Sequence, residues 1–310
     1  MIGLQIGALA LLLLVLGFAV RDAWGEALPL IRKADISDLV WAHVWLTGYY
    51  LAFVLGWMWI LRTLDIHLSY PVALQAEMVS MLAKYIPGGV WTPAARVVAV
   101  RRAGVNDNSQ ILGSIALEAG LSAVAGVFVF VISLTLVDAV DAPLWPLVGF
   151  AIVLLALLHP RIFTPLGSLL FRPFGGSRVR ALPWRTAVGL LLFYVGTWFM
   201  GGLSLYYMLR SVGDAQLSEV PYLGGAACVG AIVAVLFVFA PSGLGVREGA
   251  MYGLILAIEP RGVALATVAI NRVAITVVEA ILLLGAAAWR IHMRRRGAEA
   301  ATEPEAPVLE

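Results

Sequence analysis

Nine apolar segments occupy most of this 310-residue chain. Each is long enough to cross, or nearly cross, a hydrocarbon core about 30 Å thick. Only α-helices and closed barrels span lipid, because every backbone polar group there needs a hydrogen-bond partner within the protein. The short alternating pattern of a membrane barrel does not occur in the sequence. We therefore predict an all-α, polytopic membrane protein with about seven to nine membrane segments. The segments are 3–20, 38–61, 72–98, 110–136, 144–158, 186–209, 219–240, 241–258 and 262–289.

Composition excludes several other classes of protein. Hydrophobic residues make up 61% of the chain and charged residues 13%, which excludes an ordinary soluble domain and intrinsic disorder. The formal net charge of +2 is too small to indicate nucleic-acid binding. Cys228 is the only cysteine, and the four histidines are scattered, so we expect no disulfide within the chain and no metal site. Nucleophile, phosphate-loop and dinucleotide motifs are missing from the sequence, so we expect neither a cofactor nor an enzyme activity.

Two of the nine segments, 72–98 and 241–258, are interrupted by proline and glycine. The second contains APSGLGVREG at 240–249, where Pro241 and two glycines break the helix just before Arg247 and Glu248. Broken backbone at membrane depth is tolerated only where it is buried in protein or lines a watery cavity. Charges at that depth indicate function. The alternative interpretation is a polar loop at the membrane surface.

The two broken segments also resemble each other. When KYIPGGVWTPAAR at 84–96 is aligned with VFAPSGLGVREGA at 238–250, Pro87 meets Pro241 at an offset of 154 residues. The same offset relates Glu118 to Arg272, which have opposite charges. Paired broken helices in two inverted halves are typical of a transporter with a binding site near the midplane. We predict inverted repeats over roughly 38–136 and 192–290, the alternative being chance similarity.

The distribution of arginines suggests a topology. The loop 159–185 carries five arginines and no acidic residue, and four more arginines follow the last apolar segment, so both regions should be cytoplasmic. Nine crossings then place the N-terminus outside and the C-terminus inside, with Arg32–Lys33 and Arg101–Arg102 both inside. The broken segments are either broken spans or re-entrant hairpins, and this count favours segments that cross the membrane, or one that crosses in two halves, over two re-entrant hairpins. We expect one transmembrane domain over 1–290, followed by a disordered cytoplasmic tail over 291–310.

The charged residues near the breaks favour an anionic ligand. Helix ends near the midplane present free N–H groups and a partial positive charge, which suit phosphate, and arginine matches phosphate geometry. We predict a Glu118–Arg272 ion pair across the two halves, either functional or purely structural. Glu77 is expected nearer the surface, and Glu279 is expected to be structural. The predicted substrate-binding residues are Lys84, Tyr85, Pro87, Gly88, Gly89, Arg96, Glu118, Pro241, Gly243, Gly245, Arg247, Glu248 and Arg272.

At these residues the chain resembles the flippase-like family named after the transmembrane region of lysylphosphatidylglycerol synthase. The family's first motif, K-Y-aliphatic-P-G with a later arginine, is matched by KYIPG at 84–88 and by Arg96. Its second motif, a proline, a glycine-rich turn and a glutamate, is matched by APSGLGVRE at 240–248. Its acidic residue after the first motif falls on Glu118, and its basic residue in the last helix falls on Arg272. The resemblance covers roughly residues 5–290.

The resemblance implies the movement of lipids or lipid-linked sugars across the cytoplasmic membrane, or assistance to a glycosyltransferase partner. Two departures limit it. The chain ends soon after the last apolar segment, so the aminoacyl-transferase domain and lysyl transfer are not expected. The first motif continues VWTPAAR, without the Gly-Glu step of some members.

Together, these observations predict translocation of an anionic phospholipid or polyprenyl-phosphate lipid. Arg247 and Arg272 would contact the phosphate, while Glu118 and Glu248 would hold those arginines or exchange a proton. No nucleotide motif is present, so the energy would come from a gradient, the membrane potential or mass action. The alternatives are a small-solute or ion-coupled transporter and a non-catalytic partner of a lipid-linked glycosyltransferase.

Overall fold

The computed structural model describes residues 23–86, 89–137, 145–237 and 240–300, with the side chains of 290–300 omitted. All regular elements in these ranges are helical, which confirms the all-α prediction. The predicted segment 3–20 lies outside them. After a short helix over 23–32 come α2 (Ile36–Thr63), α3 (Tyr70–Ala83), α4 (Trp91–Arg101), α5 (Asn108–Ser133), α6 (Trp145–Leu158), α7 (Pro160–Phe171), η1 (Arg172–Phe174), α8 (Trp184–Arg210), η2 (Leu217–Glu219), α9 (Val220–Leu236), η3 (Pro241–Gly243), α10 (Val246–Ile255) and α11 (Arg261–Ala300).

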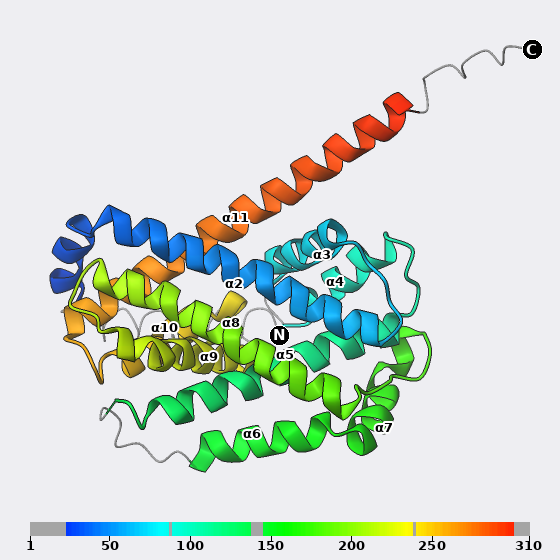
Figure 1. The fold of residues 1–310 in the computed structure, drawn as a ribbon, viewed down its shortest axis with the longest axis horizontal. Helices are drawn as coiled ribbons and strands as arrows, with labels where there is room; N and C mark the ends of the chain where they lie inside the picture. The colour runs from blue at the N-terminus through cyan, green and yellow to red at the C-terminus, as the bar shows by residue number, and fades with distance from the viewer. Residues whose placement is uncertain (1–22, 87–88, 138–144, 238–239, 301–310) are drawn as a thin grey trace, which may run out of the picture.

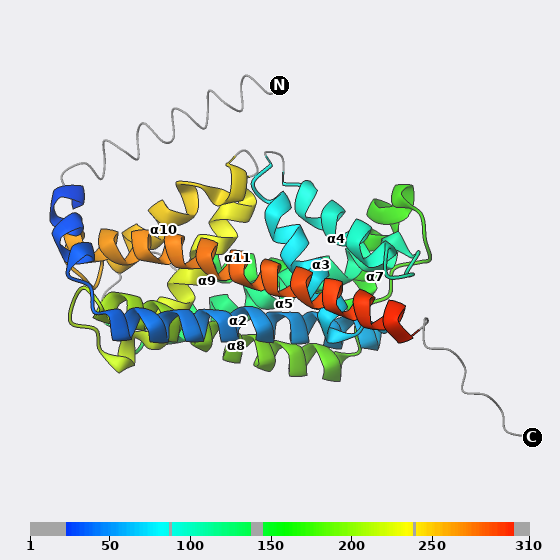
Figure 2. The same ribbon diagram turned by 90° about the horizontal axis from the view of Figure 1, so that it is seen from above.

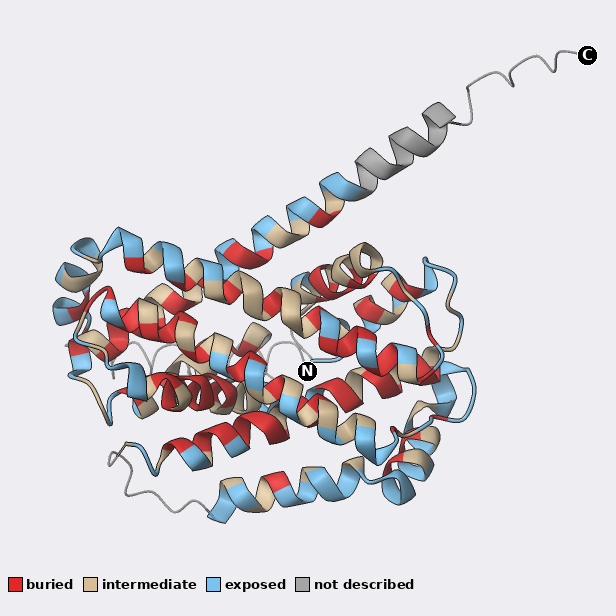
Figure 3. Ribbon diagram, viewed as in Figure 1, coloured by how far each residue is buried: buried red, intermediate tan, exposed pale blue. Residues whose placement is uncertain are grey.

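Five helical stretches in the described ranges are long and apolar enough to cross a membrane: α2, α5, α8, α9 together with η2, and α11. A sixth is reached if α6 and α7, which meet at a 77° bend, count as one span. The long helices run roughly along the longest axis of the molecule (Figure 1). Buried residues line their facing sides, whereas α6 is largely exposed (Figure 3). The chain is therefore a multi-pass helical membrane protein.

The two broken regions are hairpins. Arg96 of α4 pairs with Glu77 of α3, so these helices lie side by side. The Tyr222 hydroxyl, at the start of α9, donates to the Leu254 carbonyl near the end of α10 at 2.7 Å, which places α10 antiparallel to α9. The preference for broken segments that cross is therefore wrong. The physical reason is length, because α4 and α10 have 11 and 10 residues and each rises only about 15 Å, half the hydrocarbon core.

The hairpins reveal the inverted repeat. The order long helix, hairpin, long helix occurs as α2, α3–α4, α5 and again as α8, α9–α10, α11, running in the opposite direction (Figure 2). The aligned Gly89 and Gly243 share a positive φ, at 66° and 64°. Left-handed backbone at both positions is the local signature of the repeat. The exact boundaries, 38–136 and 192–290, stay a prediction.

The molecule has two ends, which we call end A and end B. At end A, the Asp35 N–H donates to the Ser211 carbonyl at 3.0 Å, joining the start of α2 to the end of α8. At end B, Arg180 donates to Asp65 at 2.8 Å and to the Leu64 carbonyl, joining the end of α2 to the loop before α8. Because α2 crosses once and the α3–α4 hairpin returns to end B, Arg32–Lys33 and Arg101–Arg102 lie at opposite ends. The prediction that both are inside is therefore wrong.

Glycines let α8 and α9, within the second half, pack closely. A Cβ on Gly202 of α8 would clash with the carbonyl oxygen of Val220, and one on Gly224 of α9 would clash with the carbonyl oxygen of Trp198. Backbone therefore packs directly against backbone where α8 crosses α9, the kind of contact that small residues permit between membrane helices. Gly196, also on α8, has open space at its Cβ position.

We predict that Gly202→Ala destabilises the protein by about 1–3 kcal/mol, because the neighbouring backbone cannot move away from the added methyl group. Gly196→Ala should be neutral or stabilising by up to about 1 kcal/mol, as alanine is the better helix former. Thermal unfolding of the purified protein in detergent measures both. Equal stability of the two variants would show that α8 and α9 do not pack at Gly202.

Candidate functional site

The tips of the two hairpins meet. The backbone N–H of Ser242 donates to the Lys84 carbonyl at 2.7 Å, and Figure 2 shows the α3–α4 and α9–α10 hairpins converging at one side of the bundle. The second tip is tightly turned, with positive φ at Ser242 (55°), Gly243 (64°) and Gly245 (80°). A Cβ on Gly243 would clash with Ala234. The Glu248 carboxylate accepts from the Gly245 N–H at 2.7 Å and fixes the start of α10.

Five charged residues surround these tips, and we call them the tip cluster: Lys84, Arg247, Glu248, Arg272 and Glu279. Lys84 forms an ion pair with Glu279, which also accepts from the Tyr50 hydroxyl at 2.6 Å. Arg272 pairs with Glu248 at 3.2 Å. The Tyr85 ring lies between the two cations, 5.4 Å from the Lys84 nitrogen and 5.9 Å from the Arg272 guanidinium carbon.

Arg247 has no carboxylate partner among the described residues, and its buried Nε has no hydrogen-bond partner. It lies within electrostatic range of Lys84 and Tyr50. The tip cluster therefore holds three cations and two carboxylates, a formal excess of one positive charge. The N-terminus of α10 adds partial positive charge at the same place. An anion is the ligand that this arrangement can bind.

A second charged group lies in the interior, and we call it the buried triad: Glu77, Arg96 and Glu118. The Arg96 guanidinium pairs with both carboxylates and stacks on the Trp57 ring, 4.7 Å from its centroid. The three residues are only 1%, 4% and 3% exposed, so the expectation that Glu77 lies nearer the surface is wrong. Glu77 lies on the buried face of α3, where the second arm of the same hairpin supplies its partner Arg96.

The predicted Glu118–Arg272 pair is also wrong. Each residue pairs within its own half: Arg96 on the second arm of one hairpin meets Glu118 on the following long helix. In the other half, Glu248 on the second arm meets Arg272 on the following long helix. Glu118 and Arg272, which are equivalent under the 154-residue offset, therefore each pair with a residue of opposite charge on the second arm of their own hairpin.

Aromatic rings of α2 and α8 pack near the two charged groups. Phe53 packs between Tyr49 and Tyr194, at ring-centroid distances of 5.3 and 5.1 Å. Tyr49 lies within electrostatic range of Arg247 and of both triad carboxylates. Arg96 and Glu118 pair with each other and not with a tip residue, so they are not part of the tip cluster, although the sequence grouped them with it.

The other predicted site residues lie at the tips or outside the described ranges. Gly89 and Gly245 form turns with positive φ, and Pro241 opens η3. Pro87 and Gly88 lie outside the described residues. Sequence reasoning missed Tyr50, which nothing but its contact with Glu279 singles out. Glu279, expected to be structural, anchors Lys84.

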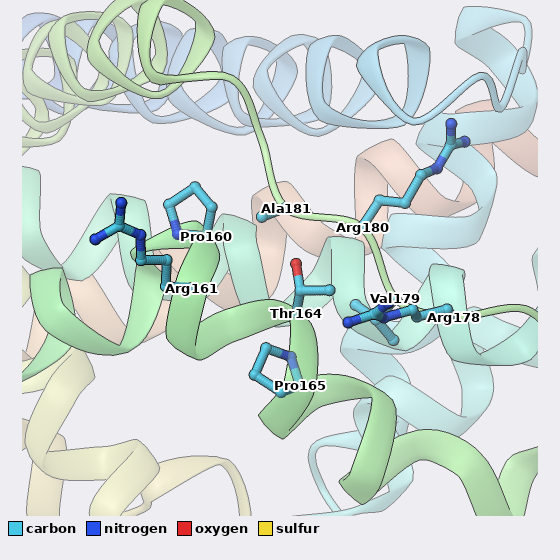
Figure 4. Close-up of a pocket in the computed structure, with 8 residues that line it drawn as sticks. All are labelled: Pro160, Arg161, Thr164, Pro165, Arg178, Val179, Arg180 and Ala181. Carbon is cyan, nitrogen blue, oxygen red and sulfur yellow. The ribbon is translucent and has the colours of Figure 1, made fainter.

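An open pocket of about 660 Å³ lies elsewhere, at end B, between α7 and residues 178–181 (Figure 4). Three arginines line it, Arg161, Arg178 and Arg180, and the last is held by Asp65. This basic surface contributes no residue to the tip cluster or the buried triad.

We predict that Arg96→Ala destabilises the protein by about 3–5 kcal/mol, since it leaves two buried carboxylates without their cation. The matched control is Arg261→Ala, which removes the cation of an exposed ion pair with Glu26 and should cost much less, because water screens exposed ion pairs. Thermal unfolding in detergent compares the two. A loss no larger for Arg96→Ala than for Arg261→Ala would contradict the burial of the triad.

Comparison with known proteins agrees with this architecture. No curated protein matches the chain. The sequence model of one family, described as the lysylphosphatidylglycerol synthase TM region, matches residues 5–285. That match contains both hairpins, the tip cluster and the buried triad. The chain therefore belongs to the lysylphosphatidylglycerol synthase TM region family, whose members are membrane proteins involved in lipid handling.

Proposed function

We propose that this protein moves an anionic lipid between the two leaflets of the membrane and that the tip cluster binds the lipid's phosphate. The observation that carries the proposal is Arg247, which has no carboxylate partner within the described ranges and lies where two broken helices meet. An unpaired charge in a membrane interior is costly unless a ligand or water compensates it. A phosphate would supply the missing negative charge.

The surrounding groups suit a phosphate. Arginine forms two parallel hydrogen bonds with phosphate oxygens, and Arg247 and Arg272 both approach the tips. The Arg272–Glu248 contact, at 3.2 Å between partly exposed side chains, can open so that Arg272 turns to a ligand. The free N–H groups at the start of α10 provide further donors. Lys84 stays fixed by Glu279 and adds a point charge.

Apolar side chains beside the tips favour a lipid over a water-soluble solute. Ile86, Val90 and Trp91 of the first hairpin are exposed, and so is the run 235–237 that ends α9. In a membrane these side chains face hydrocarbon. A ligand whose charged head group reaches the arginines while its chains stay outside matches this mixed surface. A binding site for a small solute would instead need apolar side chains that close over the cations.

Phospholipids and polyprenyl-phosphate lipids present the same phosphate chemistry. We propose that the protein acts without an enzyme activity of its own, and a glycosyltransferase partner would supply or consume a glycan-bearing lipid. The alternative is a small-solute or ion-coupled transporter, for which the formal positive excess of the tip cluster would again favour an anion.

Exchange of fluorescent lipids in liposomes tests the proposal. With purified protein and either a labelled anionic phospholipid or a labelled short polyprenyl phosphate, we expect rapid loss of leaflet asymmetry for at least one of the two. Arg247→Gln should slow exchange about 10- to 100-fold, the effect of removing a charge-assisted hydrogen bond. Arg102→Gln, which changes an exposed arginine at end B, is the matched control and should exchange at the wild-type rate.

Two results would contradict the proposal. Exchange by Arg247→Gln at the wild-type rate would remove the tip cluster as the binding site. A folded wild-type protein that exchanges neither lipid, but takes up a small anion into sealed liposomes, would establish the solute carrier.

We also propose that the protein resides in the cytoplasmic membrane with end B on the cytoplasmic side. End B carries Arg62, Arg101 and Arg102. The arginine-rich stretch 159–185, which leads into α8, also belongs to end B. At end A lie the acidic residues Asp214, Glu219 and Glu259. Cytoplasmic loops are enriched in arginine and lysine. The side of the N-terminus depends on segment 3–20, outside the described residues.

Labelling with a membrane-impermeant maleimide tests this orientation, since the single native cysteine, Cys228, is buried. Arg178→Cys at end B should react in inside-out vesicles, and Ser218→Cys at end A should react in right-side-out vesicles. Wild-type protein is the unlabelled control. The reverse pattern would place end B outside.

A further inference from the structure

The buried triad contains more carboxylates than cations. Two carboxylates, Glu77 and Glu118, face one guanidinium, and all three side chains are almost fully buried. If every group is ionised, the triad carries a formal charge of −1 in a low-dielectric interior. An uncompensated charge there is strongly unfavourable, and a group in that position changes its protonation state instead.

Unsatisfied polar atoms gather at the same place. Glu77 Oε2, Glu118 Oε1, Arg96 Nε and the Tyr194 hydroxyl are all buried, and none has a hydrogen-bond partner in the part of the chain that the structure describes. Each carboxylate contacts Arg96 through one oxygen and leaves the other free. A buried acceptor without a partner is unfavourable, because it has lost its hydrogen bonds to water. A proton added to either carboxylate turns an acceptor into a donor and removes the excess charge.

No other ionic partner compensates the triad among the described residues. Its neighbours are Trp57 and Tyr49 on α2, Ser114 and Ser122 on α5, and Tyr194 on α8. None of these five side chains carries a charge when its hydroxyl or indole is protonated. The nearest cations beyond them belong to the tip cluster, where Lys84 and Arg272 are paired with Glu279 and Glu248.

We infer that the buried triad is a proton-binding site, in which one proton is held by the Glu77–Arg96–Glu118 group as a whole. The proton adds to a carboxylate oxygen, and no other bond forms or breaks. A single carboxylate facing Arg96 would be a neutral pair with no need of a proton. Both glutamates are therefore required for the site.

The formal charges of the buried triad and of the tip cluster balance each other. The functional link between the two sites that we infer from this balance rests on the proposed function. The two groups together hold four cations, Lys84, Arg96, Arg247 and Arg272, and four carboxylates, Glu77, Glu118, Glu248 and Glu279. A phosphate with one negative charge at the tips disturbs this balance, and a proton at the triad restores it. Tyr49 is in electrostatic range of Arg247 and of both triad carboxylates, so a charge at one site acts on the same side chain as a charge at the other. Lipid binding and proton binding should therefore favour each other.

Infrared spectroscopy of the purified protein tests proton binding without any transport. Wild-type protein should show the band of a buried protonated carboxyl group that disappears as the pH rises. Glu77→Gln and Glu118→Gln should each abolish this band, because each leaves a neutral pair with Arg96. Glu26→Gln, at an exposed ion pair, is the matched control and should keep it. A wild-type protein without the band, or a band lost in only one of the two triad variants, would overturn the shared site.

Lipid exchange then tests the coupling. Under a pH gradient across the liposome, wild-type protein should accumulate the labelled lipid in one leaflet, while folded Glu118→Gln should only equilibrate it. Wild-type exchange that ignores the pH gradient but responds to a sodium gradient would overturn proton coupling and leave the proposed function intact. No lipid exchange by wild-type protein, with the infrared band present, would reject the proposed function and keep the proton site.

Discussion

The hydrogen bond from the Ser242 N–H to the Lys84 carbonyl, 2.7 Å long, joins two pieces of backbone that could not stand alone in lipid. A helix that ends inside a membrane leaves N–H and C=O groups without partners, and hydrocarbon offers none. Here each broken helix ends against the other, and the Glu248 carboxylate accepts a hydrogen bond from the Gly245 N–H. The need to satisfy backbone polar groups thus brings the two tips together. This contact also places the cations beside the tips close to one another.

Once the tips meet, the charges fall into two groups of opposite formal sign. The tip cluster has one cation more than it has carboxylates, because Arg247 has no acidic partner among the described residues. The buried triad has one carboxylate more than it has cations. Each carboxylate is paired within its own group, Glu248 and Glu279 at the tips and Glu77 and Glu118 with Arg96. A protein built only for stability would pair these charges directly or replace them with apolar residues, whereas a separation of charge is useful for binding an anion.

The sequence predicted the parts of this structure that depend on local chemistry. Long apolar runs became helices, Pro241 and the glycines marked the breaks, and the 154-residue offset placed Gly89 and Gly243 at equivalent turns. It failed where pairing in three dimensions decides. Hydropathy records apolar length along the chain, so it could not show that 219–240 and 241–258 are two arms of one hairpin. Equivalence under the repeat was mistaken for contact, although Glu118 and Arg272 each bind a residue of their own half.

The most direct test of the central claim is a cryo-electron microscopy structure of the protein in nanodiscs that contain an anionic phospholipid. The account predicts head-group density between the hairpin tips, with a phosphate within hydrogen-bond distance of Arg247 and the acyl chains passing over Ile86 and Val90. Empty hairpin tips, with anionic lipid bound only at the arginine-lined pocket of end B, would contradict it.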